Sequence, residues 1–204
     1  MTTTAETKSI SLAKVPEVTL TFWILKVIAT TVGETGGDAV SMSMNLGYLV
    51  SSAIFAAIFI AAVIAQVKAK AFHPYLYWFT IVATTTVGTT LADFADRSLH
   101  IGYAGGSALL LTLLLASLGT WYWSAGTIAV QTVRNGKTEM FYWITIMFSQ
   151  TLGTALGDWT SDSLSAGYGG GTLIFVGLLV VIAILYATTK ISRTALFWSA
   201  FVLT

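Results

Sequence analysis

The stretch TVGETGGD at residues 31–38 recurs as TVGTTLAD at 86–93 and as TLGTALGD at 151–158. Each copy follows a long apolar run and ends in an aspartate. A tryptophan lies ten residues before each first glycine, and a tyrosine preceded by glycine lies ten residues after each aspartate. The three copies align without gaps, so the chain contains an internal repeat whose unit is expected to be one supersecondary element.

The composition indicates the class of protein. Only 9% of the residues are charged, 55% are apolar, and the mean hydropathy is +0.79. A soluble domain carries about 25% charged residues. The long apolar runs match the roughly 20 helical residues that cross a bilayer core, and backbone groups without water must be satisfied within helices. We therefore predict an all-α membrane protein embedded in the lipid bilayer.

Six complete transmembrane helices and a partial seventh are expected. The six cover residues 17–39, 46–67, 74–94, 103–131, 140–158 and 168–189, and the seventh begins near 194. The polar residues 1–15 are expected to form a cytoplasmic tail, and residues 16–204 a single transmembrane domain.

The repeat unit is a two-helix hairpin. Because each unit crosses the membrane twice, successive units have the same orientation and form parallel repeats. The units cover about 16–70, 71–135 and 136–190, with a partial fourth at 191–204. The glycine and aspartate of the fourth copy would fall near 208 and 213, and whether this copy is truncated or absent from the gene product is left open.

The basic residues predict the orientation of the chain. Eight of the ten gather at one set of helix ends: Lys8, Lys14, Lys68, Lys70, Arg134, Lys137, Lys190 and Arg193. Arg97 lies at the opposite ends, and Lys26 lies inside the first span. Since cytoplasmic loops carry the excess of lysine and arginine, we expect a cytoplasmic amino terminus and motif ends that face outward.

Small residues four apart lie on one face of a helix and let membrane helices approach closely. The motifs supply three such pairs: Gly33 and Gly37, Gly88 and Ala92, Gly153 and Gly157. We interpret these pairs as helix-packing positions.

The motif aspartates Asp38, Asp93 and Asp158 admit two interpretations. Each could end or cap its helix, or the three could form an acidic site at the mouth of a cation pathway, because carboxylate oxygens suit hard cations. Glu34 and Asp162 lie four residues from the first and third aspartates, on the same helical faces. They would extend such a site.

Other polar residues of the repeats could continue the pathway or neutralise it. Thr31, Thr86 and Thr151, each seven residues before an aspartate, would line it with oxygen atoms, although threonine also occurs in ordinary helix packing. Arg97 occupies the position of Asp162 in the second unit and is interpreted as the partner of Asp93. Lys26 would snorkel toward the cytoplasm, pair with a carboxylate of another helix, or act as a charge gate.

The run Lys14-Val-Pro-Glu-Val-Thr-Leu-Thr-Phe-Trp23, with the motifs ending at Asp38 and Asp158, resembles a family of uncharacterised bacterial integral membrane proteins usually described only as "membrane-anchored". The resemblance covers nearly the whole chain. It implies a multi-pass protein of the plasma (inner) membrane and no established activity.

Together these features favour a transporter or channel for a small inorganic cation, with an outward-facing acidic site that could hold a bound divalent cation. The alternative is a membrane scaffold or accessory protein in which the motif serves packing only. Cysteines are absent and no protease, Walker or Rossmann motif occurs, so no enzyme, organic cofactor or nucleic-acid partner is expected. The identity of the ion or metal, the direction and coupling of transport, and the oligomeric state are left open.

Overall fold

The computed structural model describes residues 13–98, 101–163 and 167–204, without the side chains of Ser163 and Tyr168. The predicted tail therefore lies outside the described residues except for its last three. The described residues form helices and turns and contain no strand. The α-helices are α2 (Leu20–Asp38), α3 (Tyr48–Lys68), α4 (Pro74–Asp93), α5 (Gly102–Ala125), α6 (Gly136–Asp158), α7 (Gly167–Thr188) and α8 (Arg193–Val202). A 3₁₀ turn, η3 (Val130–Thr132), precedes α6.

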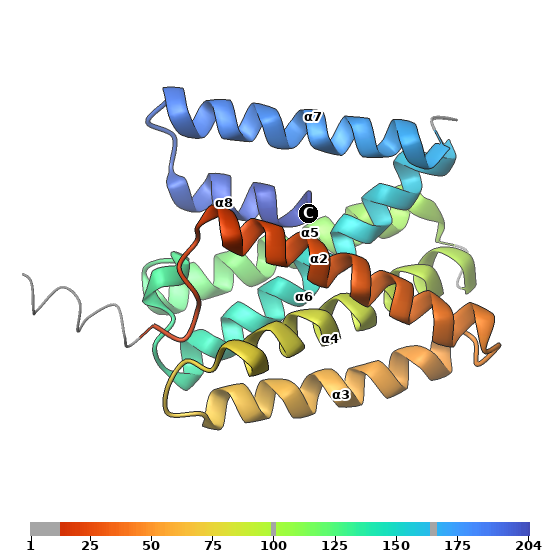
Figure 1. Ribbon diagram of the computed structural model, residues 1–204, viewed down its shortest axis with the longest axis horizontal. Helices are drawn as coiled ribbons and strands as arrows, with labels where there is room; N and C mark the ends of the chain where they lie inside the picture. Colours follow the sequence, from red (N-terminus) through yellow and green to blue (C-terminus); the bar gives the residue numbers. More distant parts are fainter. Residues whose placement is uncertain (1–12, 99–100, 164–166) are drawn as a thin grey trace, which may run out of the picture.

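The helices form a bundle in which α2, α4, α6 and α8 lie inside and α3, α5 and α7 flank them (Figure 1). Extensive contacts join α2 with α4 and α4 with α6, and α3 and α5 pack just as extensively on α4 and α6 respectively. Ring contacts of Phe22 and Trp23 with Phe197 connect α2 to α8. The first helices of successive repeats are thus neighbours, and the second helices lie on the outside.

The outer helices have the length and hydropathy of membrane-spanning segments. Among the described residues, three helices are long and apolar enough to cross a membrane: Tyr48–Lys68, Gly102–Ala125 and Gly169–Thr188. The inner helices α2, α4 and α6 have comparable lengths, 19, 20 and 23 residues. Their threonines, glycines and charged residues keep them below the same hydropathy threshold. The structure therefore supports membrane association through three helices, half of the six predicted spans.

The predicted helix ends agree with the structure to within a few residues, with one larger difference. The span expected at 103–131 ends at Ala125 because Gly126 adopts a left-handed conformation, φ 73°, and caps the helix. At the start of α6, the Asn135 side chain accepts a hydrogen bond from the Thr138 backbone N–H. The Thr138 hydroxyl in turn accepts one from the Asn135 backbone N–H, which completes a capping box. This cap starts α6 four residues before the predicted position.

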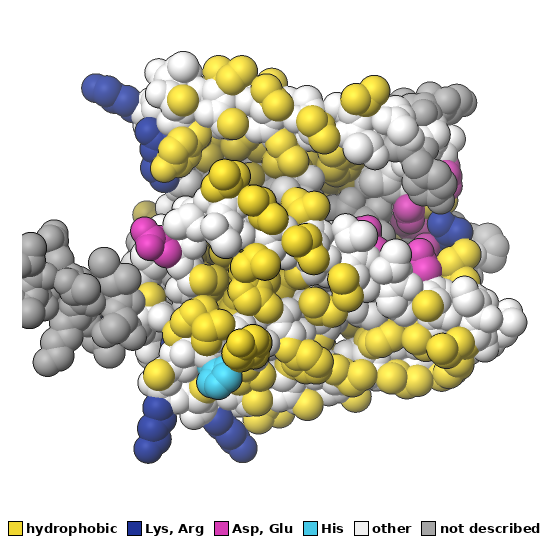
Figure 2. All heavy atoms as spheres, viewed as in Figure 1, with side chains coloured by type: hydrophobic (Ala, Val, Ile, Leu, Met, Phe, Trp, Pro, Cys, Tyr) yellow, Lys and Arg dark blue, Asp and Glu magenta, His cyan; other side chains and the backbone are white. Residues whose placement is uncertain are grey.

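The two ends of the bundle differ in charge. Lysine and arginine side chains stand mainly at the left end in Figure 2, and acidic side chains gather at the right end around a basic one. The helix bounds place the carboxyl ends of α2, α4 and α6, with the motif aspartates, at that right end. All three motifs therefore lie on the same side of the bundle, as parallel repeats require.

The segment before α2 is tied to the opposite end of the bundle. The Lys14 Nζ atom lies 2.8 Å from the Glu139 Oε1 atom and also donates to the backbone oxygens of Gln66 and Val67. Glu139 is buried, and this burial raises the pKa of its carboxyl, against the opposing effect of Lys14. This ion pair connects the amino-terminal segment with the end of α3 and the start of α6.

Candidate functional site

Each motif aspartate is the last residue of an α-helix and precedes a five-residue π-helical turn. The turns are η1 (Ala39–Ser43), η2 (Phe94–Ser98) and η4 (Trp159–Ser163). π-helical turns are rare and occur often at functional sites. The Asp38 side chain makes no capping hydrogen bond. Helix capping therefore does not explain why the first repeat has an aspartate at this position.

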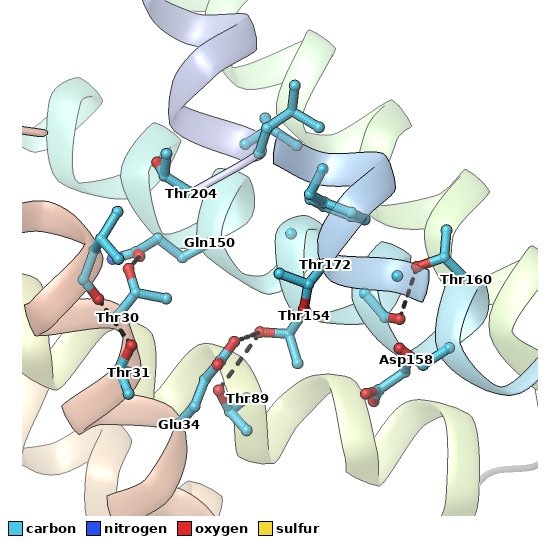
Figure 3. A pocket seen from close by; sticks show the side chains of 18 of the residues that line it. Thr30, Thr31, Glu34, Thr89, Gln150, Thr154, Asp158, Thr160, Thr172 and Thr204 are labelled. Atoms are coloured by element: carbon cyan, nitrogen blue, oxygen red, sulfur yellow. Dashed lines mark hydrogen bonds between the residues drawn. The ribbon is translucent and has the colours of Figure 1, made fainter. Parts of the chain in front are cut away.

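The three aspartates line one cavity of about 520 Å³. Its walls come from α2, α4, α6 and α7, and the end of α8 borders it (Figure 3). Six charged residues line it: Lys26, Glu34, Asp38, Asp93, Arg97 and Asp158. Four carboxylates thus share a cavity with two basic side chains.

The positions in and around the cavity follow one pattern in all repeats, in steps of four residues back from each aspartate. Such positions form a nearly continuous stripe along a helix. Aligned positions form four layers: Asp38, Asp93 and Asp158; Glu34, Thr89 and Thr154; Thr30, Thr85 and Gln150; Lys26, Ile81, Ile146 and Phe201. Four of them are not among the lining residues: Ile81, Thr85, Ile146 and Phe201. Hydrogen bonds or ring contacts join members within the layers, as described next.

The first layer lies at the mouth and is bridged by Arg97. The Arg97 Nε atom lies 2.8 Å from the Asp93 Oδ1 atom, and an Arg97 terminal nitrogen lies 3.8 Å from the Asp158 Oδ2 atom. The predicted pair of Arg97 with Asp93 is therefore present, and Arg97 also reaches the third repeat. Two of the three aspartates are partly neutralised, whereas Asp38 forms no ion pair among the described residues.

The second layer combines one carboxylate with two hydroxyls. Thr154 Oγ1 donates to Glu34 Oε1 at 3.4 Å, and the hydroxyl oxygens of Thr89 and Thr154 lie 3.5 Å apart. Figure 3 shows these three side chains pointing toward one another from α2, α4 and α6. They form an oxygen-rich layer one helical turn inside the mouth.

The third layer is centred on the amide of Gln150. Its Oε1 atom accepts hydrogen bonds from Thr85 at 2.7 Å and from Thr30 at 3.5 Å, and its Nε2 atom donates to the Ile81 backbone oxygen. Gln150 and Thr85 are buried. Since both ends of the amide are bonded, this layer is held in one arrangement.

The floor below is mostly apolar. Ile81, Ile146 and Phe201 are fully buried, and the Lys26 Nζ atom lies 4.6 Å from the centre of the Phe201 ring. One turn further, the hydroxyls of Tyr77 and Tyr142 are 2.5 Å apart and are also buried. Buried side chains therefore fill the space between the inner helices beyond Lys26, on the side away from the motif aspartates.

The three repeats also match a known family. The sequence matches the family described as Repeat of Unknown Function (DUF347) at residues 21–72, 76–127 and 141–192. The chain belongs to the DUF347 family. No match was found among curated proteins or among solved structures. The matched segments cover the three hairpins, so each DUF347 repeat contributes one inner helix to the cavity and one outer helix.

Several residues predicted for the site hold other positions in the DUF347 repeats. Thr31 lines the cavity, but Thr86 and Thr151 lie outside its lining, bond to backbone oxygens of their own helices and pack beside Gly37 and Gly88. Of the three predicted threonines, the structure therefore places Thr31 at the cavity and Thr86 and Thr151 at helix contacts. The threonines that belong to the layers in these two repeats are Thr85, Thr89 and Thr154.

Asp162 also differs from the prediction. Its Oδ2 atom accepts a hydrogen bond of 2.6 Å from the Tyr103 hydroxyl on α5, and the residue lies outside the cavity lining. Asp96, in the turn after α4, is buried against Gly106, and burial raises the pKa of its carboxyl, partly opposed by Arg97. These two acidic residues belong to the outer connections, not to the layers.

Most of the predicted packing glycines lie at close helix crossings. A Cβ atom at Gly33 would lie 2.7 Å from the Thr85 Cβ atom, one at Gly88 3.0 Å from the Thr151 hydroxyl, and one at Gly153 2.5 Å from the Val202 backbone oxygen. Gly37 makes ordinary contact with Thr86, and Ala92 is buried. Gly157 departs from the prediction because no described heavy atom lies within 4 Å of its virtual Cβ; it lines the cavity.

The layers contain residues that sequence reasoning missed: Thr30, Thr85, Thr89, Gln150 and Thr154. Their signal is present in the aligned repeats, at four and eight residues before each aspartate. Within the described part of the chain, no three or more acidic or histidine residues are grouped so that they could hold a metal ion.

Proposed function

We propose that this protein transports a small inorganic cation through the cavity between its inner helices. The observation that carries the proposal is the stack of oxygen-rich layers, made by equivalent positions of three repeats, inside helices whose outer neighbours are apolar. Four carboxylates against two basic side chains leave the cavity with an excess of negative charge. Ionisable residues at membrane depth that face a cavity are typical of ion pathways.

In this proposal α2, α4 and α6 also cross the membrane, which gives six spans. Their polar faces are turned to the cavity and to one another, so they need not be apolar all round. The basic helix ends face the cytoplasm and the motif ends face outward in the plasma membrane. The cavity is then open to the outside.

The closed floor favours a carrier over an open channel. Ile81, Ile146 and Phe201, with the tyrosine pair beneath them, fill the axis below the third layer. A cation that reaches Glu34 must wait for this floor to rearrange. Alternating opening of the two ends is the usual behaviour of transporters built from repeated units.

The test is cation uptake into liposomes that contain the purified protein, with Na⁺, K⁺, Mg²⁺ and Mn²⁺ offered singly. Loss of one charged ligand costs about 1.5–3 kcal/mol, so Asp38→Asn and Glu34→Gln are expected to weaken apparent cation affinity roughly ten- to a hundredfold. Asp162→Asn is the matched control, because this carboxylate bonds Tyr103 outside the cavity, and it should transport like the wild type.

If both cavity variants transport like the wild type, the assignment of the pathway to this cavity fails. If no cation moves, the transport proposal fails. The alternative, a membrane scaffold in which the motif serves helix packing, is then favoured, and it makes its own prediction. Under it, Gly33→Leu should impair the protein more than any of the carboxylate substitutions, because that glycine has no space for a side chain.

A further inference from the structure

The repeat pattern is broken at two positions of the cavity, and both lie on α2. Lys26 occupies the floor position where the other units have Ile81 and Ile146. Glu34 occupies the second-layer position where they have Thr89 and Thr154. One unit therefore introduces one positive and one negative charge into a frame that is otherwise neutral at these two levels.

Lys26 is a buried ammonium with few partners. Its exposed fraction is 1%, its Nζ atom donates to Thr30 Oγ1 at 3.0 Å, and the Phe201 ring lies beneath it. Within residues 13–98, 101–163 and 167–204, no carboxylate forms an ion pair with it. An ammonium has three donors, so this side chain has bonding capacity left toward the cavity that it lines.

Glu34 is the carboxylate that acts on Lys26 electrostatically. It lies two helical turns nearer the mouth, about 12 Å along the helix between the two backbones. Its side chain accepts a hydrogen bond from Thr154 and forms no ion pair within the described part of the chain. The two charges thus compensate each other through the polar layers and not by contact.

Most of the remaining titratable groups around Lys26 are occupied elsewhere. On α4 and α6, Asp93 and Asp158 pair with Arg97 at the mouth. Below the floor, the hydroxyls of Tyr77 and Tyr142 bond each other. The parts of α7 and α8 that line the cavity contribute no ionisable side chain. Asp38, nearer the mouth on α2 itself, forms no ion pair in the described part of the chain. Lys26 is the cavity-lining basic group on the inner side of Glu34, so loss of its proton can offset the charge of a cation bound there.

We propose that Lys26 carries an exchangeable proton, and that binding of a cation at Glu34 releases this proton to the cavity water. The inference rests on the proposed transport function and deepens it to cation–proton exchange. In the step, one N–H bond of the ammonium breaks, its electron pair stays on the nitrogen, and the proton leaves with water. A monovalent cation enters as a proton leaves, so the net charge of the cavity is unchanged.

The experiment measures protons released when NaCl, KCl, MgCl₂ or MnCl₂ is added alone to purified protein in weakly buffered detergent solution near pH 6.5, with a pH-indicator dye. Wild type is expected to release about one proton for each cation bound, because one lysine titrates. Lys26→Met should bind the cation and release about one proton fewer for each cation bound. Lys70→Met, at an exposed lysine, is the control and should behave like wild type.

A second variant keeps the test decisive if Lys26→Met unfolds. Lys26→Arg retains the charge, and a guanidinium does not lose its proton, so this variant should fold but lose cation binding and uptake. Equal proton release by wild type and Lys26→Met, or uptake by Lys26→Arg at the wild-type rate, would overturn the inference. Uptake by wild type without proton release overturns the exchange alone, whereas no binding or uptake at all overturns the transport function as well.

Discussion

Two glycines on one helix allow the close packing of the inner helices to be measured. A Cβ atom at Gly33 would lie 2.7 Å from the Thr85 Cβ atom and 3.0 Å from the Val82 backbone oxygen, both on α4. At Gly36, one turn further along α2, a Cβ atom would have no described atom of another helix within 4 Å. Gly33→Ala and Gly36→Ala thus add the same methyl group in a crowded and in an open place.

The expected magnitude follows from two opposing effects. Replacing a helical glycine by alanine stabilises by about 0.5–1 kcal/mol in either position. Overpacking at Gly33 costs about 1–3 kcal/mol, because the neighbouring atoms belong to the backbone or are attached directly to it. The helix effect cancels between the variants, so Gly33→Ala should be less stable than Gly36→Ala by about 1–3 kcal/mol.

The assay is thermal unfolding of both purified variants in the same detergent. For a chain of this length, a difference of about 2 kcal/mol shifts the Tm by roughly 4–8 °C. Because Thr85 also bonds Gln150, the crowded variant should in addition disturb the third layer of the cavity. Equal Tm values, or a lower Tm for Gly36→Ala, would refute the packing of α2 on α4 described above.

Three further predictions concern the charged and aromatic contacts. Lys14→Met breaks the pair with a buried glutamate and should destabilise the protein by about 3 kcal/mol at pH 7, whereas the exposed Lys70→Met should not. This loss of stability should shrink as the pH falls toward 4, because burial raises the pKa of that glutamate and the folded state then holds a proton that the unfolded state releases. Thermal unfolding at several pH values checks both points, and a loss that grows toward acid pH would contradict them. Tyr77→Phe or Tyr142→Phe alone leaves a buried hydroxyl without its partner and should lower the free energy of unfolding by about 1–3 kcal/mol. The double variant should lower it by less than the sum of the two single variants. Additive Tm shifts would contradict the contact between the two hydroxyls. Arg97→Gln removes the guanidinium between two aspartates and should raise the affinity for Mg²⁺ about three- to tenfold, after allowance for the partial exposure of the arginine. Calorimetric titration of wild type and variant measures this change, and an unchanged or lower affinity would contradict an acidic cation site at the mouth.

Much of the architecture could be predicted from the sequence. The three hairpins, their common orientation and most helix ends follow from the spacing of the repeated motif. Pro74 begins α4 as expected. The error at the end of α5 came from reading through Gly126 into an apolar segment, although a glycine after a helical run is a known stop signal.

The cavity lining was harder to predict, for a geometric reason. Thr31 lies seven residues before Asp38, nearly on the same line of a straight helix, and therefore looked like the natural continuation of the site. The layers instead follow steps of four, which wind around the helix by about 40° per step. Such a stripe lines a common axis only when the helices cross that axis at an angle, and one sequence does not give crossing angles.

The division between polar inner and apolar outer helices also bears on how the chain is made. In the proposed topology α2, α4 and α6 emerge from the ribosome first in each hairpin, yet they fall below the hydropathy of a self-inserting segment. The apolar helix that follows each one meets that threshold. Each hairpin should therefore enter the bilayer as a pair, with the later helix retaining the earlier one, and separating the two by a long insertion should leave the inner helix outside the membrane.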